Sequence, residues 1–213
     1  MEILVIGATG RTGRHIVRMA LNEGHRVTAF VRSPEKLDRP QTGVKVVQGD
    51  ALDATAVHNL INNNNFDSVV IAIGADTLKC SNVRGDSTKN VITALENRNA
   101  PTRLWIVSSV GTNESMDQLG FFSKAFVKTI LKGHIADHTN QENYLKESSL
   151  PYTIVRPTGL KDESSNGGYI VLEKGRLPTD RVSRQDVAHF IIKNIDNEAY
   201  LGKAVTLTSA KKD

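Results

Sequence analysis

The sequence has almost no cysteine, since Cys80 is the single one among 213 residues. One cysteine cannot form a disulfide within the chain, which excludes disulfide-stapled secreted domains and favours a reducing compartment. We expect Cys80 to be a small, semi-buried residue rather than a reactive thiol, because no histidine lies near it in the sequence. Long hydrophobic runs are also missing: no apolar stretch approaches the length of a membrane span, and we find no signal peptide. We therefore expect a cytoplasmic protein with no membrane partner.

Aromatic residues make up only 5% of the chain, and the basic residues are dispersed. The formal net charge is +4, but no basic block is longer than Lys211-Lys212 and no basic stretch is interleaved with aromatic side chains. This distribution argues against a nucleic-acid partner. The basic excess favours a small anionic ligand, such as a phosphorylated cofactor. A solvated basic surface is the common alternative.

The first fourteen residues carry the strongest signal in the chain. An apolar, β-branched run over residues 3–6 enters a loop with Gly7, Gly10 and Gly13, and a helical pattern follows at once. Gly7 permits the tight turn, Gly10 lets the backbone approach a pyrophosphate, and Gly13 lets the helix pack against the strand. The phosphate is then expected at the helix N-terminus, where unpaired N–H groups attract negative charge. The order strand, glycine loop, helix predicts a dinucleotide-binding site.

The end of the second expected strand, residues 26–31, indicates which dinucleotide. An NAD site usually has Asp or Glu at this point, whereas this sequence has Arg32, followed by Ser33 and Lys36. Such side chains suit a 2′-phosphate through charge-assisted hydrogen bonds. The prediction is NADP, and the alternative is an exposed arginine at a strand end.

Two carboxylates follow the third expected strand, residues 44–47. Asp53 is expected to cap the short helix after it. Asp50 is placed to accept a hydrogen bond from the adenine amino group, or it is a second helix cap, and the sequence leaves both open.

The rest of the chain alternates between strand and helix signals. Further strands are expected at 68–73, 104–107, 152–155, 169–172 and 204–208, with helices at 83–97, 137–148 and from the capping box at Ser183 through Lys193. This alternation, with no internal repeat, predicts an α/β fold: a doubly wound, mostly parallel Rossmann-like sheet. We expect a single domain over residues 1–213 with a small C-terminal substrate-side lobe, and substrate-side segments at about 111–140 and 159–182.

Several residues are expected at the carboxyl edge of this sheet. The small residues after strand four, Gly74 and Ala75, suit a flat adenosine. Ser108 and Ser109 follow strand five, where Ser109 would donate a hydrogen bond to the acceptor or the carboxamide; satisfied polar groups ending a strand are the alternative. An apolar stripe is predicted to be core or pocket wall, and comprises Phe121, Phe122, Phe126, Ile130 and Leu131. Arg156, or a pocket between Phe121, Phe122 and Tyr169, would shape the acceptor site.

The motifs read together resemble a known family. They are the glycine loop, Arg32, Gly49-Asp50, Ser108-Ser109, the segment 152–157 and the helix from Ser183 to Ala188, and they span nearly the whole chain. The chain resembles the atypical short-chain dehydrogenase/reductase proteins, above all the biliverdin reductase B/flavin reductase group, with the NmrA-like proteins a step further off. The resemblance implies a Rossmann-like fold, NADPH, and hydride transfer to a flavin or tetrapyrrole-like acceptor stacked on the nicotinamide.

The resemblance also implies roles for residues. Ser108, Ser109 and Val110 would line the nicotinamide side, with Ser108 and Ser109 as the candidate catalytic residues. Arg32 and Lys36 match basic positions around the 2′-phosphate, and Asp50 matches an adenine contact. The full set of expected cofactor contacts is Gly7, Ala8, Thr9, Gly10, Arg11, Thr12, Gly13, Arg32, Ser33, Lys36, Asp50, Ala51, Ile73, Gly74, Ser108, Val110, Pro157 and Thr158. The expected substrate contacts are Phe121, Phe122, His138, Arg156 and Tyr169.

The sequence departs from the wider superfamily at one place and from the biliverdin reductase B group at another. The Tyr-x-x-x-Lys pair is absent, because Tyr144 is followed by Leu-Lys-Glu-Ser, so Tyr144 is expected to be a helix-surface or packing residue. Thr158 and Gly159 stand where the biliverdin reductase B group has a histidine. His138 falls at a position where that group also has a histidine, but for His138 and the nearby His134 a helix-surface position is the favoured alternative.

Two functions follow. The first is an NADPH-dependent reductase of a flavin, such as FMN, or of another planar conjugated acceptor, biliverdin-like or a quinone. Such chemistry needs no dedicated protein acid, because the cofactor supplies the hydride and water can supply the proton. The alternative is a non-catalytic NADP(H)-binding redox sensor or assembly protein of the NmrA-like type, with a protein partner. A nucleotide-sugar epimerase is a weaker third option, since the tyrosine base is missing. No metal site is expected.

Overall fold

The structure, a computed structural model, describes residues 1–37, 43–74, 82–98, 101–163 and 168–210. The expectations for Cys80, Ala75, residues 164–167 and Lys211-Lys212 fall outside these ranges.

An eight-stranded sheet forms the centre of the molecule, with strand order β3-β2-β1-β4-β5-β6-β10-β8. Neighbouring strands from β3 to β10 run parallel, and β8 alone pairs antiparallel, with β10. The strands are β1 (Glu2–Ile6), β2 (Arg26–Val31), β3 (Val44–Gln48), β4 (Ser68–Ile71), β5 (Arg103–Val107), β6 (Tyr152–Pro157), β8 (Tyr169–Leu172) and β10 (Lys203–Ser209). The predicted doubly wound, mostly parallel fold is confirmed, and its order reverses between β1 and β4.

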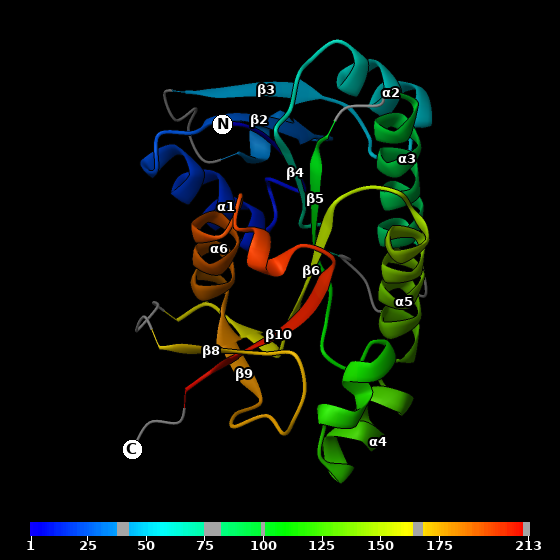
Figure 1. The fold of residues 1–213 in the computed structure, drawn as a ribbon, viewed down its shortest axis with the longest axis vertical. Coiled ribbons are helices and arrows are strands. Elements are labelled where there is room, and N and C mark those ends of the chain that lie inside the picture. The colour runs from blue at the N-terminus through cyan, green and yellow to red at the C-terminus, as the bar shows by residue number, and fades with distance from the viewer. Residues whose placement is uncertain (38–42, 75–81, 99–100, 164–167, 211–213) are drawn as a thin grey trace.

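Helices cover both faces of this sheet (Figure 1). On one side lie α1 (Arg11–Asn22) and α6 (Arg184–Lys193), and on the other lie α2 (Ala54–Asn62), α3 (Val83–Arg98) and α5 (Lys132–Glu147). The alternation of β1 feeds both cores, because Ile3 and Val5 belong to the first and Leu4 and Ile6 to the second. A strand buried on both faces must be apolar throughout, which explains the unbroken run in the sequence.

Side-chain caps fix where two of these helices begin. Asp53 accepts from the backbone N–H groups of Thr55 and Ala56, as predicted for α2. Ser183 accepts from the N–H of Asp186 at 2.9 Å and so starts α6 at the predicted point.

Two regions differ from expectation. Helix α5 begins at Lys132, five residues before the expected 137. In its first turn, Ile135 lies close to Gly111, as Val127 of α4 does. A second, two-stranded parallel sheet joins β7 (Gly159–Lys161) to β9 (Arg181–Ser183), and neither short strand was expected.

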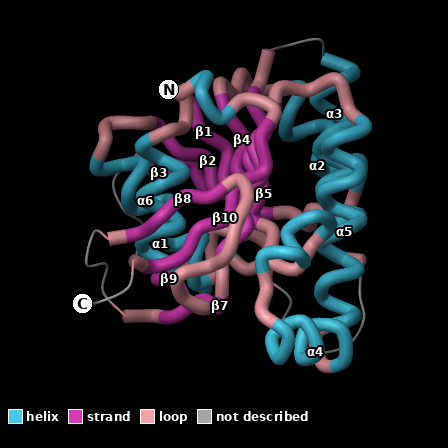
Figure 2. The backbone as a smooth tube through the Cα atoms, turned by 60° about the horizontal axis from the view of Figure 1, so that its bottom comes forward, coloured by secondary structure: helices cyan, strands magenta, loops and turns pink. Residues whose placement is uncertain are grey.

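Shorter elements complete the fold. Helix α4 (Phe121–Thr129) lies beyond the end of α5 (Figures 1 and 2). Short 3-10 turns are η1 (Pro34–Lys36), η2 (Asn113–Gln118) and η3 (Glu198–Tyr200). Within the described residues, no helix is both long and apolar enough to cross a membrane.

Candidate cofactor and acceptor site

The glycine loop is a cradle that side chains would fill. Gly7 has φ +87°, and a Cβ there would lie 2.6 Å from the carbonyl oxygen of Ala72. A Cβ at Gly13 would lie 2.1 Å from the carbonyl oxygen of Gly7, which is well inside contact distance. The N–H of Gly10 donates to that same oxygen at 2.9 Å, and Gly10 caps α1 without a side chain. The first N–H groups of α1 therefore face the loop, as an anion site requires.

A cavity of about 210 Å³ opens beside this loop, at the carboxyl ends of β1 to β4. This is the point where the strand order reverses, which is where ligands bind in doubly wound folds. Of the expected cofactor contacts, the cavity is lined by Gly7, Thr9, Gly10, Arg32, Ser33, Lys36, Asp50, Ala51, Ile73 and Gly74. The other lining residues were not among the expected cofactor contacts, and they are Ile6, Phe30, Val31, Gly49, Val83 and Ser87.

Arg14 connects the glycine loop to η1, the turn that contains Lys36. Its Nε donates to the carbonyl oxygen of Thr9 at 3.0 Å, and its Nη2 donates to that of Lys36 at 2.7 Å. These bonds connect the glycine loop to η1, and both segments line the cavity. The sequence analysis missed Arg14; its position directly after Gly13, in the first turn of α1, is the signal that could have indicated it.

Asp50 makes a turn contact rather than the helix cap that was the alternative expectation. Its Oδ1 accepts from the N–H of Leu52 at 3.0 Å, and the residue also lines the cavity. The neighbouring Gly49 is required for packing, since a Cβ there would lie 2.4 Å from the ring of Phe30. The helix-cap alternative for Asp50 is therefore wrong, because Asp53 caps α2, and the adenine contact stays a prediction.

Helix α3 contributes a polar atom to the same cavity. Ser87 is buried, and its Oγ has no hydrogen-bond partner among the described residues. A buried hydroxyl without a partner calls for a ligand or an ordered water. Ser87 is therefore a further candidate ligand contact.

Arg11 links the glycine loop to the C-terminal lobe. Its Nη1 donates to Asp162 Oδ2 at 2.8 Å, and Asp162 Oδ1 accepts from Arg184 at 2.7 Å. Asp162 lies directly after β7, so the bridge joins three segments far apart in the sequence. The remaining expected contacts do not line the cavity. Ala8, Thr12 and Gly13 are buried around the loop, and Ser108, Val110, Pro157 and Thr158 are buried at the ends of β5 and β6.

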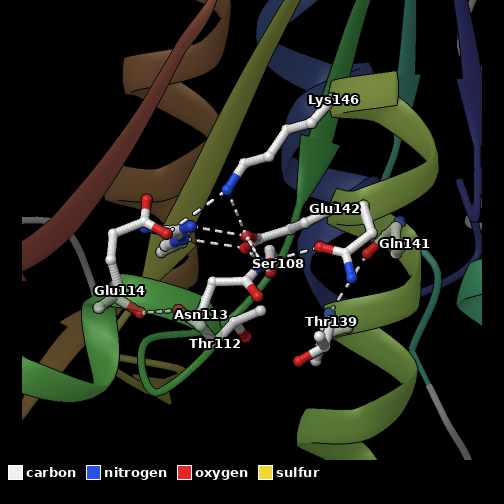
Figure 3. Close-up of polar contacts among 12 residues, drawn as sticks. Ser108, Thr112, Asn113, Glu114, Thr139, Gln141, Glu142 and Lys146 are labelled. Atoms are coloured by element: carbon white, nitrogen blue, oxygen red, sulfur yellow. Dashed lines mark hydrogen bonds and ion pairs between the residues drawn. The ribbon is translucent and has the colours of Figure 1, made fainter. Parts of the chain in front are cut away.

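A buried charge network occupies the carboxyl ends of β5 and β6 (Figure 3). Glu142 of α5 is fully buried and accepts four hydrogen bonds. Its Oε1 accepts from Ser108 Oγ at 2.6 Å and Arg156 Nε at 2.9 Å, and its Oε2 accepts from Arg156 Nη2 at 2.6 Å and Asn113 Nδ2 at 2.9 Å. Four donors use the full accepting capacity of a carboxylate. Sequence analysis missed Glu142 altogether.

A second carboxylate completes the network. Arg156 Nη1 donates to Glu114 Oε1 at 2.8 Å, and Lys146 Nζ lies 3.4 Å from Glu114 and 3.7 Å from Glu142. Burial alone would raise the pKa of Glu114, but hydrogen bonds from Arg156 and the backbone, with the charges of Arg156 and Lys146, lower this pKa to about 2. Two acids thus offset two bases.

This network defines what Ser108, Ser109 and Arg156 can do. The hydroxyl of Ser108 donates its hydrogen bond to Glu142. Toward a ligand, Ser108 can therefore only accept a hydrogen bond. Ser109 Oγ donates to the carbonyl oxygen of Val110 at 3.1 Å. Arg156 is only 1% exposed, and three of its nitrogens donate to carboxylates. This arrangement favours a positioning role for Arg156 over direct contact with an acceptor.

Other polar atoms nearby are buried and have no hydrogen-bond partner among the residues that the structure describes. They are Thr112 Oγ1, Gln118 Nε2 and Thr158 Oγ1. Hydrogen bonds connect two of these residues to β10. Thr206 donates to Gln118 Oε1 at 2.6 Å, and the N–H of Thr158 donates to the carbonyl oxygen of Leu207. The ends of β5, β6 and β10 therefore offer hydrogen-bonding groups beside Ser108.

The part of the chain that the structure describes does not bring Phe121, Phe122 and Tyr169 together as the expected pocket requires. Phe121 and Phe122 are 81% and 86% exposed, so the prediction that they form core or pocket wall is wrong. The hydroxyl of Tyr169 instead forms a hydrogen bond with His189 Nδ1 at 3.0 Å, and its ring packs edge-on against Phe190. Its strand, β8, and helix α4 lie apart in both views (Figures 1 and 2).

His138 is buried, so the expectation of a helix-surface position is wrong for this residue. It lies 3.3 Å from Gln141, which in turn donates to Thr88 of α3 at 3.0 Å. Burial, with the charges of Arg84 and His134, lowers the pKa of His138 to about 3 against the opposing hydrogen bond of Gln141. The imidazole is a neutral packing group between α3 and α5. Tyr144 is a packing residue, as predicted, and its ring lies against Gly85.

A parallel sheet with a glycine cradle and a cavity at its switch point defines a Rossmann-type nucleotide-binding protein. A sequence profile of the family described as NAD(P)H-binding matches residues 7–198, and the chain belongs to that family. The expected resemblance to atypical short-chain dehydrogenase/reductase proteins is thereby confirmed.

Known proteins similar to this chain differ in function. The anaerobilin reductase ChuY from Escherichia coli O157:H7 superposes with a TM-score of 0.84 and 25% identity, covering 100% of this chain and 99% of that one. A short-chain dehydrogenase/reductase from Veillonella parvula in complex with NADP has the same fold, with a TM-score of 0.82 and 17% identity over 98% of this chain and 94% of that one. The photosystem II assembly factor Ycf39 from Synechocystis is 25% identical over 99% of this chain, which spans 63% of that protein's length.

Proposed function

We propose that this protein is an NADPH-dependent reductase that transfers hydride to a flavin, such as FMN, or to another planar conjugated acceptor, biliverdin-like or a quinone. One observation carries the proposal: a single cavity joins the glycine cradle to Arg32, Ser33 and Lys36. The cradle fits a pyrophosphate, because Gly7 and Gly13 leave no room for a Cβ. The 25% identity to an anaerobilin reductase supports a reductase with a conjugated acceptor.

The preference for NADPH rests on charge at the end of β2. Arg32 and Lys36 line the cavity where an NAD-binding protein would have an acid that accepts from the ribose hydroxyls. Glu35 belongs to the same turn but is exposed and is not among the lining residues. A 2′-phosphate would therefore meet two cations and the Ser33 hydroxyl.

When bound, NADPH would supply the hydride, and this chain would supply position. The first turn of α1 and the glycine loop would hold the pyrophosphate, and Asp50 would accept from the adenine amino group. Glu142 fixes the Ser108 proton, so that Ser108 would accept from the carboxamide N–H₂. No side chain would need to act as the acid, because the acceptor could take its proton from water.

The test is NADPH oxidation followed at 340 nm with purified protein. FMN, riboflavin, biliverdin and a simple quinone are offered in turn, with NADH as the control. We expect turnover of at least one acceptor with NADPH preferred over NADH. Tight NADPH binding without turnover of any of them would refute the reductase function.

That second outcome would favour an NADP(H)-binding sensor or assembly protein with a protein partner. Its specific support is the similarity to Ycf39 over 99% of this chain, together with the engagement of Ser108 and Arg156 by Glu142. This function requires a change in partner binding when NADPH is added. Pull-down of the partner with and without NADPH would measure that change.

A further inference from the structure

Helix α4 exposes an apolar face at one end of the molecule. Phe121, Phe122, Phe126 and Ile130, here called the α4 face, are 81%, 86%, 55% and 60% exposed. The opposite side of the helix packs against the rest of the molecule, where Val127 is buried close to Gly111. It projects beyond α5 in both views (Figures 1 and 2). Four large apolar side chains in ten residues are more than isolated exposure, and such a patch marks an interaction surface.

Within the segment that carries the α4 face, residues 118–136, every Asp, Glu, Lys or Arg is a lysine. Lys124, Lys128 and Lys132 recur every four residues through the same segment, and no Asp or Glu occurs from residue 118 to 136. Lys124 lies 3.2 Å from Asp117, just before the segment. Lys128 is exposed beside the phenylalanines. A short helix with aromatic side chains and interleaved lysines has the composition of an interfacial helix, which lies in the headgroup region of a membrane.

We propose that the α4 face binds the surface of an anionic lipid membrane. The phenylalanines would enter the boundary between headgroups and acyl chains, and the lysines would contact anionic headgroups. The sequence analysis expects no membrane partner because the chain lacks a spanning segment, but surface binding needs only an exposed amphipathic helix.

Charge complementarity argues against a second copy of this chain as the occupant. A two-fold contact repeats the same patch on both sides, so the lysines of one copy would face those of the other. A small planar acceptor is also a poor occupant, because the four side chains extend over more than two helical turns. A membrane surface matches both the extent and the charge.

The test is co-sedimentation of the full-length protein with vesicles. We expect binding to phosphatidylcholine vesicles that contain phosphatidylglycerol, little binding to phosphatidylcholine alone, and weakening by salt. Phe121→Ser/Phe122→Ser should reduce binding to the anionic vesicles by about tenfold or more. Lys128→Gln/Lys132→Gln should reduce it by about tenfold. The matched control is Leu201→Ser, which removes an exposed apolar side chain elsewhere on the surface and should leave binding unchanged.

Circular dichroism melts check that each variant is folded, which the exposure of the substituted side chains leads us to expect. The proposal is overturned if the wild type does not sediment with anionic vesicles, or if the double phenylalanine variant binds as well as the wild type. It is also overturned if sedimentation equilibrium shows a dimer that the same variant converts to monomer, since the α4 face would then contact a second copy.

Discussion

Replacing Glu142 by glutamine is the sharpest test of the charge network. The side chain keeps its shape, but one carboxylate oxygen becomes an N–H₂ group. Each oxygen of Glu142 accepts two hydrogen bonds, so two of the four bonds would become contacts between donors. The buried guanidinium of Arg156 would also lose its fully buried counter-charge.

The expected loss follows from those contacts. Breaking one partner of a buried ion pair costs about 3–5 kcal/mol, because the remaining charge stays out of water. Removing both charges together, in Glu142→Leu/Arg156→Met, should recover most of this loss, since no buried charge is then left alone. The matched control is Glu173→Gln, because Glu173 pairs with Lys203 at 2.7 Å on the surface. We expect that control to change stability by less than about 1 kcal/mol.

The assay is urea unfolding, with the free energy of unfolding taken from the midpoint at constant slope. A loss of less than about 1 kcal/mol for Glu142→Gln, no larger than that of Glu173→Gln, would refute the assignment of the network as a buried structural unit.

Three further predictions follow from the geometry. Arg32→Ala should weaken NADPH binding by about 1.5–3 kcal/mol and leave NADH binding nearly unchanged; fluorescence titration measures both, and equal losses for the two cofactors would exclude a 2′-phosphate role for Arg32. Gly13→Ala should abolish cofactor binding, because its Cβ would lie 2.1 Å from the Gly7 oxygen, whereas Gly120→Ala, with nothing within 4 Å, should bind normally in the same titration. His138 has a folded-state pKa of about 3, below its usual value, so the stability it contributes is present above pH 6.5 and is lost as the pH falls toward 3. Unfolding free energy should therefore fall by an extra ~1.4 kcal/mol per pH unit over that window, and His138→Gln should remove this slope; an unchanged slope would contradict it.

The glycine loop and its place beside the basic residues after β2 were predictable because their constraints are local. The strand, the glycine loop and the helix follow one another within fourteen residues, and Arg32 directly follows β2. A close approach of the backbone requires glycines within the loop itself, and a charge at a strand end is the residue that follows the strand. Arg14 escaped attention because its partners are backbone carbonyls, which any sequence supplies.

The charge network around Glu142 depends on contacts between elements that are distant in the sequence. Glu142 reaches Ser108, 34 residues earlier, and nothing in the helix around it indicates that partner. Arg156 did carry a signal, since a charged residue inside an apolar strand needs a buried counter-charge. The α4 stripe was misjudged for a different reason: periodicity shows that a helix has an apolar face, but not what covers it.

The charge network at the ends of β5 and β6 also sets a condition on the pH dependence of any turnover. Glu114, with a pKa of about 2, stays ionised, and His138, with a pKa of about 3, stays neutral from about pH 5 to 8. The Ser108 hydroxyl donates its hydrogen bond to Glu142 and is therefore not placed to protonate a reduced acceptor. We therefore expect kcat for a non-titrating acceptor to be flat across this range, because water supplies the proton. A bell-shaped profile would reveal a protein acid, and it would show that the network rearranges to release one when cofactor and acceptor are bound.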